Sequence, residues 1–145
     1  MIAIDTNILV YAHRKDSPSY DIAKEMVTDL SEGSAAWALP WPCVHEFLSV
    51  VTNVRIFGTP SSASDAIDQV DAWLESPSVV LLAESGQHWP ELCAIVKASR
   101  VAGRLIHDAR IAALCRQHGV RELWSADRDF SRFPDLNVVN PLVLR

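Results

Sequence analysis

The sequence predicts one α/β domain built on a central parallel sheet, with helices on both faces. Short apolar runs alternate along the chain with segments whose apolar side chains recur at helical spacing. Strands that alternate with helices are joined by right-handed crossovers, which make the sheet parallel and cover both of its faces. No repeat, low-complexity tract or long linker divides the 145 residues, so we expect a single domain over residues 1–145.

In the first half of the chain, two expected strands each precede a helical segment. Residues 2–4 are predicted to form a strand that runs straight into Asp5, and residues 35–39 a strand ended by Pro40. Pro42 suits the first turn of the second helix, where an amide hydrogen would be unpaired in any case. The two helical stripes consist of Ala23, Met26, Val27 and Leu30, and of Cys43, Phe47, Val50, Val51 and Val54.

The second half of the chain continues the same alternation after a loop over residues 58–64. A β-branched run predicts a buried strand at residues 79–82, and a helix is expected over residues 106–118, capped by Gly119. Short strands are expected near residues 122–124 and 137–139. The remaining helical stripes consist of Ala66, Ile67, Val70, Trp73 and Leu74, and of Leu92, Ile95, Val96 and Ser99.

The composition predicts a cytoplasmic protein that does not enter a membrane. Cys43, Cys93 and Cys115 show no zinc-binding spacing, and an odd number of cysteines among apolar neighbours indicates reduced thiols. Charges or prolines interrupt every apolar run short of the roughly 18 residues that a membrane span needs. The N-terminus lacks the basic and then apolar segments of a signal peptide, because Asp5 comes too early.

The charge distribution leaves nucleic-acid binding open. The formal net charge of −5 argues mildly against a purely electrostatic attraction to nucleic acid. However, residues 97–145 carry 9 basic and 5 acidic side chains, whereas residues 1–96 carry 4 basic and 13 acidic ones. Most of the basic residues in the C-terminal part are arginines, whose planar guanidinium suits phosphates. A solvated basic face would give the same pattern.

Five acidic residues occupy positions that suggest a site. Asp5 ends the first strand, and Asp127 and Asp129 follow the strand near residues 122–124. If these strands are parallel neighbours, their carboxyl ends lie at the same edge of the sheet. Asp108 heads the buried face of its helix, and Glu46 borders an apolar stripe. Each acid alone could equally cap a turn or interact with a helix dipole.

Convergence of these acids would require a counter-charge. Two carboxylates about 4 Å apart repel each other by about 4 kcal/mol at an effective dielectric constant near 20. Several such pairs need protonation or a bound cation, and ligands that are all oxygen favour Mg²⁺ or Mn²⁺. A hard cation among carboxylates suits phosphodiester cleavage, because it activates water and neutralises developing negative charge.

Four segments carry the candidate acids. They are DTNILVY at residues 5–11, VHEFL at residues 44–48, IHDA at residues 106–109 and SADRDF at residues 125–130. In these segments and in their order the chain resembles the PIN-domain nucleases, and among them most closely the VapC toxins of bacterial toxin–antitoxin pairs. The match runs from residue 1 to residue 141. Each segment is weak evidence alone, whereas the ordered set is specific.

The resemblance implies a PIN-like, Rossmann-like α/β/α sandwich and an endoribonuclease that depends on Mg²⁺ or Mn²⁺. It further implies a homodimer, a cognate VapB-like antitoxin, and cleavage of structured RNA (tRNA or rRNA) that inhibits translation. The metal-binding and catalytic acids carry over to Asp5, Glu46, Asp108 and Asp127, with Asp129 as a further candidate ligand. Thr6 or Asn7, and Ser125, match polar positions that support these acids or their waters.

Other functions are compatible with parts of this pattern. An aspartate-based phosphatase would use Asp5 as its nucleophile, but it usually needs a second acid two residues later, where this chain has Asn7. A non-catalytic RNA- or protein-binding module could share the fold. His45 and His107 adjoin two of the acids, yet neighbours in a helix point in different directions, so we expect surface or packing roles for both.

Overall fold

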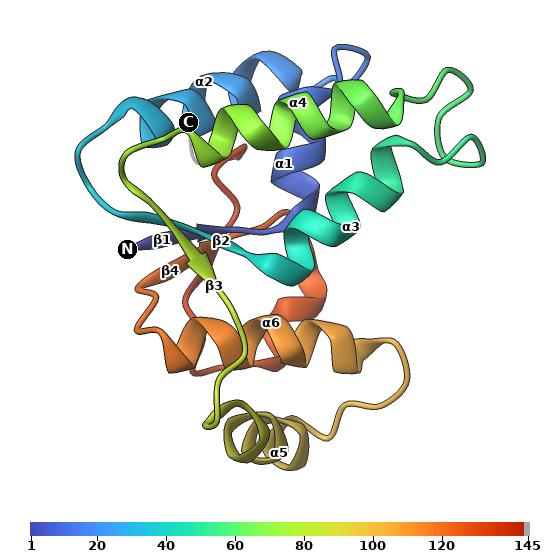
Figure 1. Ribbon diagram of the computed structural model, residues 1–145. Coiled ribbons are helices and arrows are strands. Elements are labelled where there is room, and N and C mark those ends of the chain that lie inside the picture. The colour runs from blue at the N-terminus through green and yellow to red at the C-terminus, as the bar shows by residue number, and fades with distance from the viewer. Residues whose placement is uncertain (144–145) are drawn as a thin grey trace.

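The protein, described here by a computed structural model of residues 1–143, is built on one five-stranded sheet (Figure 1). Its strands are β1 (Ile2–Ile4), β2 (Trp37–Pro40), β3 (Val79–Leu82), β4 (Glu122–Trp124) and β5 (Val138–Val139). They lie in the order β3-β2-β1-β4-β5, and every neighbouring pair is parallel. The expected fold class is therefore confirmed, while the last two positions of the expected domain lie outside the described residues.

Helices cover both faces of the sheet. The helices are α1 (Thr6–His13), α2 (Tyr20–Glu32), α3 (Trp41–Val51), α4 (Ala63–Leu74), α5 (His88–Ser99), α6 (Leu105–Gln117) and the 3₁₀ helix η1 (Arg128–Arg132). Figure 1 shows α1, α2 and α4 on one side of the strands and α5 and α6 on the other. Helix α3 continues from the end of β2 and packs against α1 and α4. Within residues 1–143, no helix is both long and apolar enough to cross a membrane.

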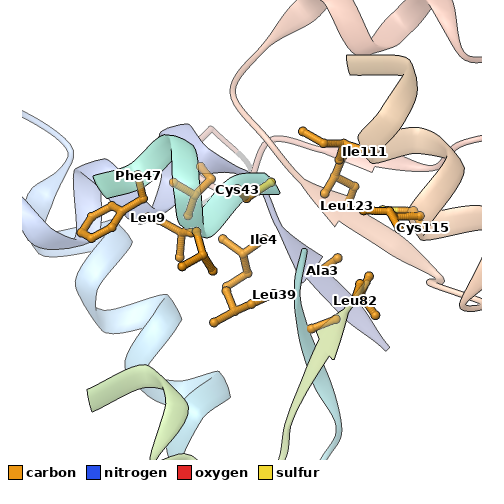
Figure 2. Packing of buried hydrophobic residues seen from close by; sticks show 14 of the residues in the cluster. Ala3, Ile4, Leu9, Leu39, Cys43, Phe47, Leu82, Ile111, Cys115 and Leu123 are labelled. Carbon is orange, nitrogen blue, oxygen red and sulfur yellow. The ribbon is translucent and has the colours of Figure 1, made fainter. Parts of the chain in front are cut away.

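Alternate side chains of the strands fill the two halves of the core, one on each face of the sheet. Ile4 and Leu39 lie on the face that α1 and α3 cover, whereas Ala3, Leu82 and Leu123 lie on the face that α6 covers (Figure 2). All five side chains are fully buried. Burying an apolar side chain of the size of leucine contributes about 1.5–3 kcal/mol, and a one-residue slip would exchange the two faces. The core therefore fixes the strand register that brings the carboxyl ends together.

Helix α1 was not expected from the sequence. It begins at Thr6, directly after β1, and the side chain of Asp5 accepts a hydrogen bond from the Thr6 amide as its N-terminal cap. The buried residues of this short helix are Thr6, Ile8, Leu9, Val10 and Ala12. Because burial extends around most of the helix, the segment lacks the amphipathic spacing by which helices are recognised in sequence.

The predicted end of α3 was wrong. The apolar stripe predicted a helix as far as Val54, but α3 ends at Val51, and Val54 is 68% exposed. The chain turns there because the Asn53 carbonyl accepts hydrogen bonds from two amides further along, those of Ile56 and Phe57. At the start of α3, Pro40 is both the last residue of β2 and the N-cap. Strand and helix are thus joined without a loop.

Candidate active site

Two neighbouring strands bring the first polar residues of the site together. Asp5 directly follows β1 and Ser125 directly follows β4, and the two strands pair in register at Ile4 and Trp124. The Asp5 amide donates to the Trp124 carbonyl oxygen at 2.9 Å, which extends the ladder into the site. Asp5 is only 5% exposed. The expected meeting of these two strand ends is present in the structure.

Four donors hold the Asp5 carboxylate. Oδ1 accepts from the Thr6 amide at 2.8 Å and from the Cys43 thiol, whose Sγ lies 3.6 Å away. Oδ2 accepts from the Ser125 hydroxyl at 2.7 Å and from the Asn7 side-chain amide at 3.2 Å. Both oxygens are therefore oriented by protein donors, as a buried carboxylate requires.

The same polar network fixes the loop after β4. The Asn7 amide also donates to the Ser125 hydroxyl oxygen at 3.2 Å, and Asn7 Oδ1 accepts from the Ala126 amide at 3.0 Å. Ser125 Oγ accepts from the Asp127 amide at 3.0 Å, and Asp127 Oδ1 accepts from the Asp129 amide at 2.8 Å. Asp127, and not Asp129, thus caps the turn that begins η1.

The structure gathers all five predicted acids at this edge of the sheet. Asp5, Glu46, Asp108 and Asp127 line one pocket of about 300 Å³. Asp108, Asp127 and Asp129 each offer a carboxylate oxygen, and these three oxygens lie within 4.8 Å of one another. The Thr6 hydroxyl donates to Glu46 Oε2 at 3.3 Å, which ties α3 to the N-terminus of α1. Acids from four separate segments therefore share a single small volume.

The carboxylates of this cluster repel one another, and two of their pKa values are raised. Burial, and then the charges of Asp127, Asp5, Asp129 and Glu46, raise the pKa of Asp108 to about 6. The pKa of Asp5 is also raised, mainly by burial and further by the Glu46 charge, although its hydrogen bonds oppose that rise. A divalent cation would offset this repulsion, and a donor set made only of carboxylate oxygens fits Mg²⁺ or Mn²⁺.

The sequence pointed to some residues of the site only indirectly. Cys43 is fully buried and donates to Asp5, but its place in an apolar stripe predicted burial alone. His45 and His107 are exposed, in agreement with their expected surface role, and they line a cleft beside Glu46. Arg110 lines the same cleft and pairs with the carboxylate of Glu84.

Apolar and aromatic side chains line the same pocket as the acids, and we call them the apolar wall. They come from α1, from α3 and from the segment between α3 and α4: Val10, Tyr11, Val50, Ile56 and Phe57. No feature of the sequence indicated that this wall and the acids would share a pocket, because the wall depends on the unexpected helix α1 and on the early end of α3.

Comparison with known proteins agrees with this architecture. A model of the PIN domain matches residues 2–136, and the chain belongs to the PIN-domain family. Ribonuclease VapC48 of Mycobacterium tuberculosis is 31% identical over 137 residues, which are 94% of each chain. Ribonuclease VapC43 of the same species is 34% identical over 142 residues, which are 98% of this chain and 96% of the relative. Within the family, the chain thus falls among the VapC ribonucleases.

Solved structures show the same fold at lower identity. A chain of the VapBC2 structure from Rickettsia felis superposes with a TM-score of 0.67 at 19% identity. The match covers 96% of this protein and 98% of the VapBC2 chain. Mycobacterium tuberculosis VapC20, described as a sarcin–ricin loop cleaving toxin, superposes with a TM-score of 0.66 at 17% identity. That match covers 90% of this chain and 93% of VapC20.

Replacing Asp108 with asparagine should stabilise the metal-free protein at neutral pH. The raised pKa means that the folded state holds the Asp108 proton more tightly than the unfolded state, whose value is near 3.8. Stability from this group is therefore full below about pH 4 and is lost as the pH rises through about 6. We expect Asp108→Asn to raise the free energy of unfolding at pH 7.5 by about 1–2 kcal/mol, because one pKa unit equals about 1.4 kcal/mol and solvent screens a half-exposed carboxyl.

Urea denaturation in a chelating buffer at pH 7.5 and at pH 4 would measure this effect. The gain should vanish at pH 4, where Asp108 is protonated in the wild type. Asp68→Asn, at an exposed position of α4, is the matched control and should change neither value. A destabilised Asp108→Asn variant at pH 7.5 would contradict the repulsion described above.

Proposed function

We propose that this protein is the toxin of a type II toxin–antitoxin pair and an endoribonuclease that depends on Mg²⁺ or Mn²⁺. The observation that carries the proposal is the pocket in which Asp5, Glu46, Asp108 and Asp127 converge. The curated relatives that cover almost the whole chain are named as ribonucleases, which supports the same reaction. A single catalytic domain over residues 1–145 is part of the proposal, because all five strands join one sheet.

The proposed metal ligands are these four acids, with Asp129 as a further contributor. When bound, a divalent cation supplies positive charge beside the scissile phosphate and lowers the pKa of an attacking water. Asp5 keeps its orientation without the cation, since both of its oxygens accept protein hydrogen bonds. Glu46 is oriented by the Thr6 hydroxyl. Preorganisation of this kind lowers the reorganisation needed when substrate arrives.

A structured RNA is the substrate that we propose, of the tRNA or rRNA class. The fold neighbour VapC20 is described as cleaving the sarcin–ricin loop, which supports rRNA as one candidate. Cleavage of such an RNA would stop translation and would place the reaction in the cytoplasm. Sequencing the 5′ ends of RNA fragments after induced expression would identify the cleaved bond, and an unchanged pattern of ends would contradict the proposal.

An aspartate-based phosphatase is less well supported. The position two residues after Asp5 holds Asn7, whose amide donates to Asp5 and to Ser125 and cannot act as a general acid there. A non-catalytic binding module would retain the acids without cleaving RNA. Gel-based assays of RNA cleavage in Mg²⁺ or Mn²⁺ separate both alternatives from a nuclease, because neither would cleave RNA.

Asp5→Asn should abolish RNA cleavage in Mg²⁺ or Mn²⁺ while the protein stays folded. Asparagine keeps the volume of the side chain and the acceptor for the Thr6 amide, but it removes the charge that attracts a hard cation. Its free energy of unfolding should stay within about 1 kcal/mol of the wild type, because relief of a buried charge offsets weaker hydrogen bonds. Gel-based cleavage and circular dichroism would measure both properties.

The matched control for this variant is Asp29→Asn, at an exposed position of α2. It should cleave at the wild-type rate. If Asp5→Asn retained full activity with either metal, the assignment of the site would be wrong.

Asp127→Asn should lower metal affinity and rate more than Asp129→Asn does. Asp127 belongs to the three-carboxylate cluster and also lines the acidic pocket, whereas Asp129 belongs to the cluster alone. Loss of a direct ligand should lower metal affinity or activity more than loss of a group that only contacts a ligand. Loss of such an outer group itself lowers metal affinity or activity about 10–100-fold. Parallel Mn²⁺ titrations and cleavage assays would compare the two. Greater damage from Asp129→Asn, with both variants folded, would reverse our assignment.

We further propose a VapB-like antitoxin that places a basic side chain in the acidic pocket. The Rickettsia felis neighbour is VapBC2 bound to a DNA fragment from its promoter, which supports an antitoxin partner. A guanidinium could substitute for the charge of the cation, since bidentate arginine–carboxylate pairs are strong. A homodimer is also expected, and sedimentation of the purified protein would test it.

Expression with and without the adjacent gene would test for the antitoxin. We expect growth arrest from the chain alone, and a copurifying complex with no cleavage activity when both genes are expressed. Harmless expression of an active enzyme without a partner would contradict the pairing.

A further inference from the structure

The segment that joins α3 to α4, residues 52–62, forms part of the apolar wall of the acidic pocket. We call it the α3–α4 loop; it lies at the right of Figure 1. Ile56 and Phe57 of this loop line the acidic pocket together with Tyr11 of α1. Ile56 is 54% exposed, whereas Phe57 is partly buried and packs against the core. A nucleotide beside a phosphodiester bound at the carboxylates would therefore lie within the pocket that these side chains line.

Arg14, just after α1, fixes this loop. Its guanidinium carbon lies 4.1 Å from the centroid of the Phe57 ring. The same guanidinium donates to the Thr59 carbonyl oxygen at 2.9 Å and to Ser61 Oγ at 3.3 Å. Asp16 accepts two further hydrogen bonds from it, at 2.6 and 2.9 Å. The Arg14 side chain is only 12% exposed, so the planar group is held between the loop and Asp16.

Additional contacts keep the loop in the same place. His13 Nε2 lies 2.9 Å from Ser61 Oγ, and its Nδ1 lies 3.2 Å from Gln69 Oε1 on α4. The Asn53 carbonyl accepts the Phe57 amide at 3.0 Å, which closes the turn. Asp5 thus caps the N-terminus of α1, while His13 and Arg14 at its C-terminus hold the α3–α4 loop.

We propose that Phe57 stacks on an unpaired base next to the scissile phosphodiester of the RNA, and that Arg14 is the positioning residue that holds Phe57 there. This inference rests on the nuclease function proposed above. Proteins recognise unpaired RNA bases mainly by stacking them on aromatic side chains. Four carboxylates line the pocket, and the proposed cation would offset their charge at the scissile phosphate, so an uncharged contact is well suited to hold the neighbouring nucleotide.

Arg14 suits the positioning role because of its shape. Its guanidinium carbon lies over an aromatic ring while its N–H groups donate to a carbonyl, a hydroxyl and a carboxylate. Lysine carries the same charge but has neither the planar face nor the fork of donors. Arg14→Lys should therefore release the loop without changing the net charge.

The experiment compares Phe57→Leu, Phe57→Tyr and Arg14→Lys with the wild type on a short fluorescent RNA hairpin with an unpaired loop in Mn²⁺. Loss of one base stack should raise KM by about 5- to 100-fold in Phe57→Leu, with kcat and Mn²⁺ affinity near the wild-type values. Phe57→Tyr keeps the aromatic face and should stay close to the wild type. Arg14→Lys should raise KM and also speed amide hydrogen exchange over residues 52–62 in the free protein.

Val54→Ala is the matched control, because Val54 lies in the same loop and is 68% exposed. It should leave KM and hydrogen exchange unchanged. An unchanged KM in Phe57→Leu would overturn the proposal, as would a loss of Mn²⁺ affinity, which would indicate damage to the acids. A Phe57→Leu variant that cleaves normally but escapes inhibition by the antitoxin would assign the wall to protein docking instead.

Binding of the same RNA in Ca²⁺, followed by fluorescence anisotropy, separates this inference from the proposed function. A wild-type protein that binds the RNA but does not cleave it in Mn²⁺ would refute the nuclease and leave stacking testable by Phe57→Leu. Equal anisotropy of the wild type and Phe57→Leu would refute stacking in either case.

Discussion

The buried carboxylate of Asp5 is the constraint on which the site depends. It lies where β1 becomes α1, and its two oxygens accept hydrogen bonds from donors on three different segments. A charged group at 5% exposure persists only where its hydrogen bonds and counter-charges are supplied. The Ser125 hydroxyl, the Thr6 amide, the Cys43 thiol and the Asn7 side-chain amide supply the hydrogen bonds. In the proposed function, a cation or a basic side chain of a partner supplies the counter-charge.

The sequence predicted the strand positions well because apolar runs and amphipathic helices leave clear patterns. The expectation that β3 is buried was wrong, because β3 lies at the edge of the sheet and only Leu82 of its four residues is buried. All five strands were expected within two residues of their ends, and the parallel pairing of β1 with β4 was the condition for bringing Asp5 near Asp127. Helix α1 escaped prediction because burial extends around most of it, so it shows no polar stripe. The end of α3 was misplaced because Val54 continued the apolar spacing although it is exposed.

The candidate acids were identifiable for a different reason. Each was located by its place at a strand end or a helix face, and the family resemblance connected them. Periodic patterns in the sequence did not predict the contacts between segments that lie far apart in the chain. The bond from Cys43 to Asp5 and the contact of Arg14 with Phe57 depend on how helices pack, and single-segment patterns carry no such information.

The strand order has a consequence for how such an enzyme is made. The fourth strand lies beside the first, so the edge that carries Asp5 is completed only when residues 122–127 have joined it. During synthesis, the acids of the first three-quarters of the chain, Asp5, Glu46 and Asp108, would emerge from the ribosome before Asp127. If these acids hold the cation as proposed, the metal site forms only when nearly the whole chain is available for folding.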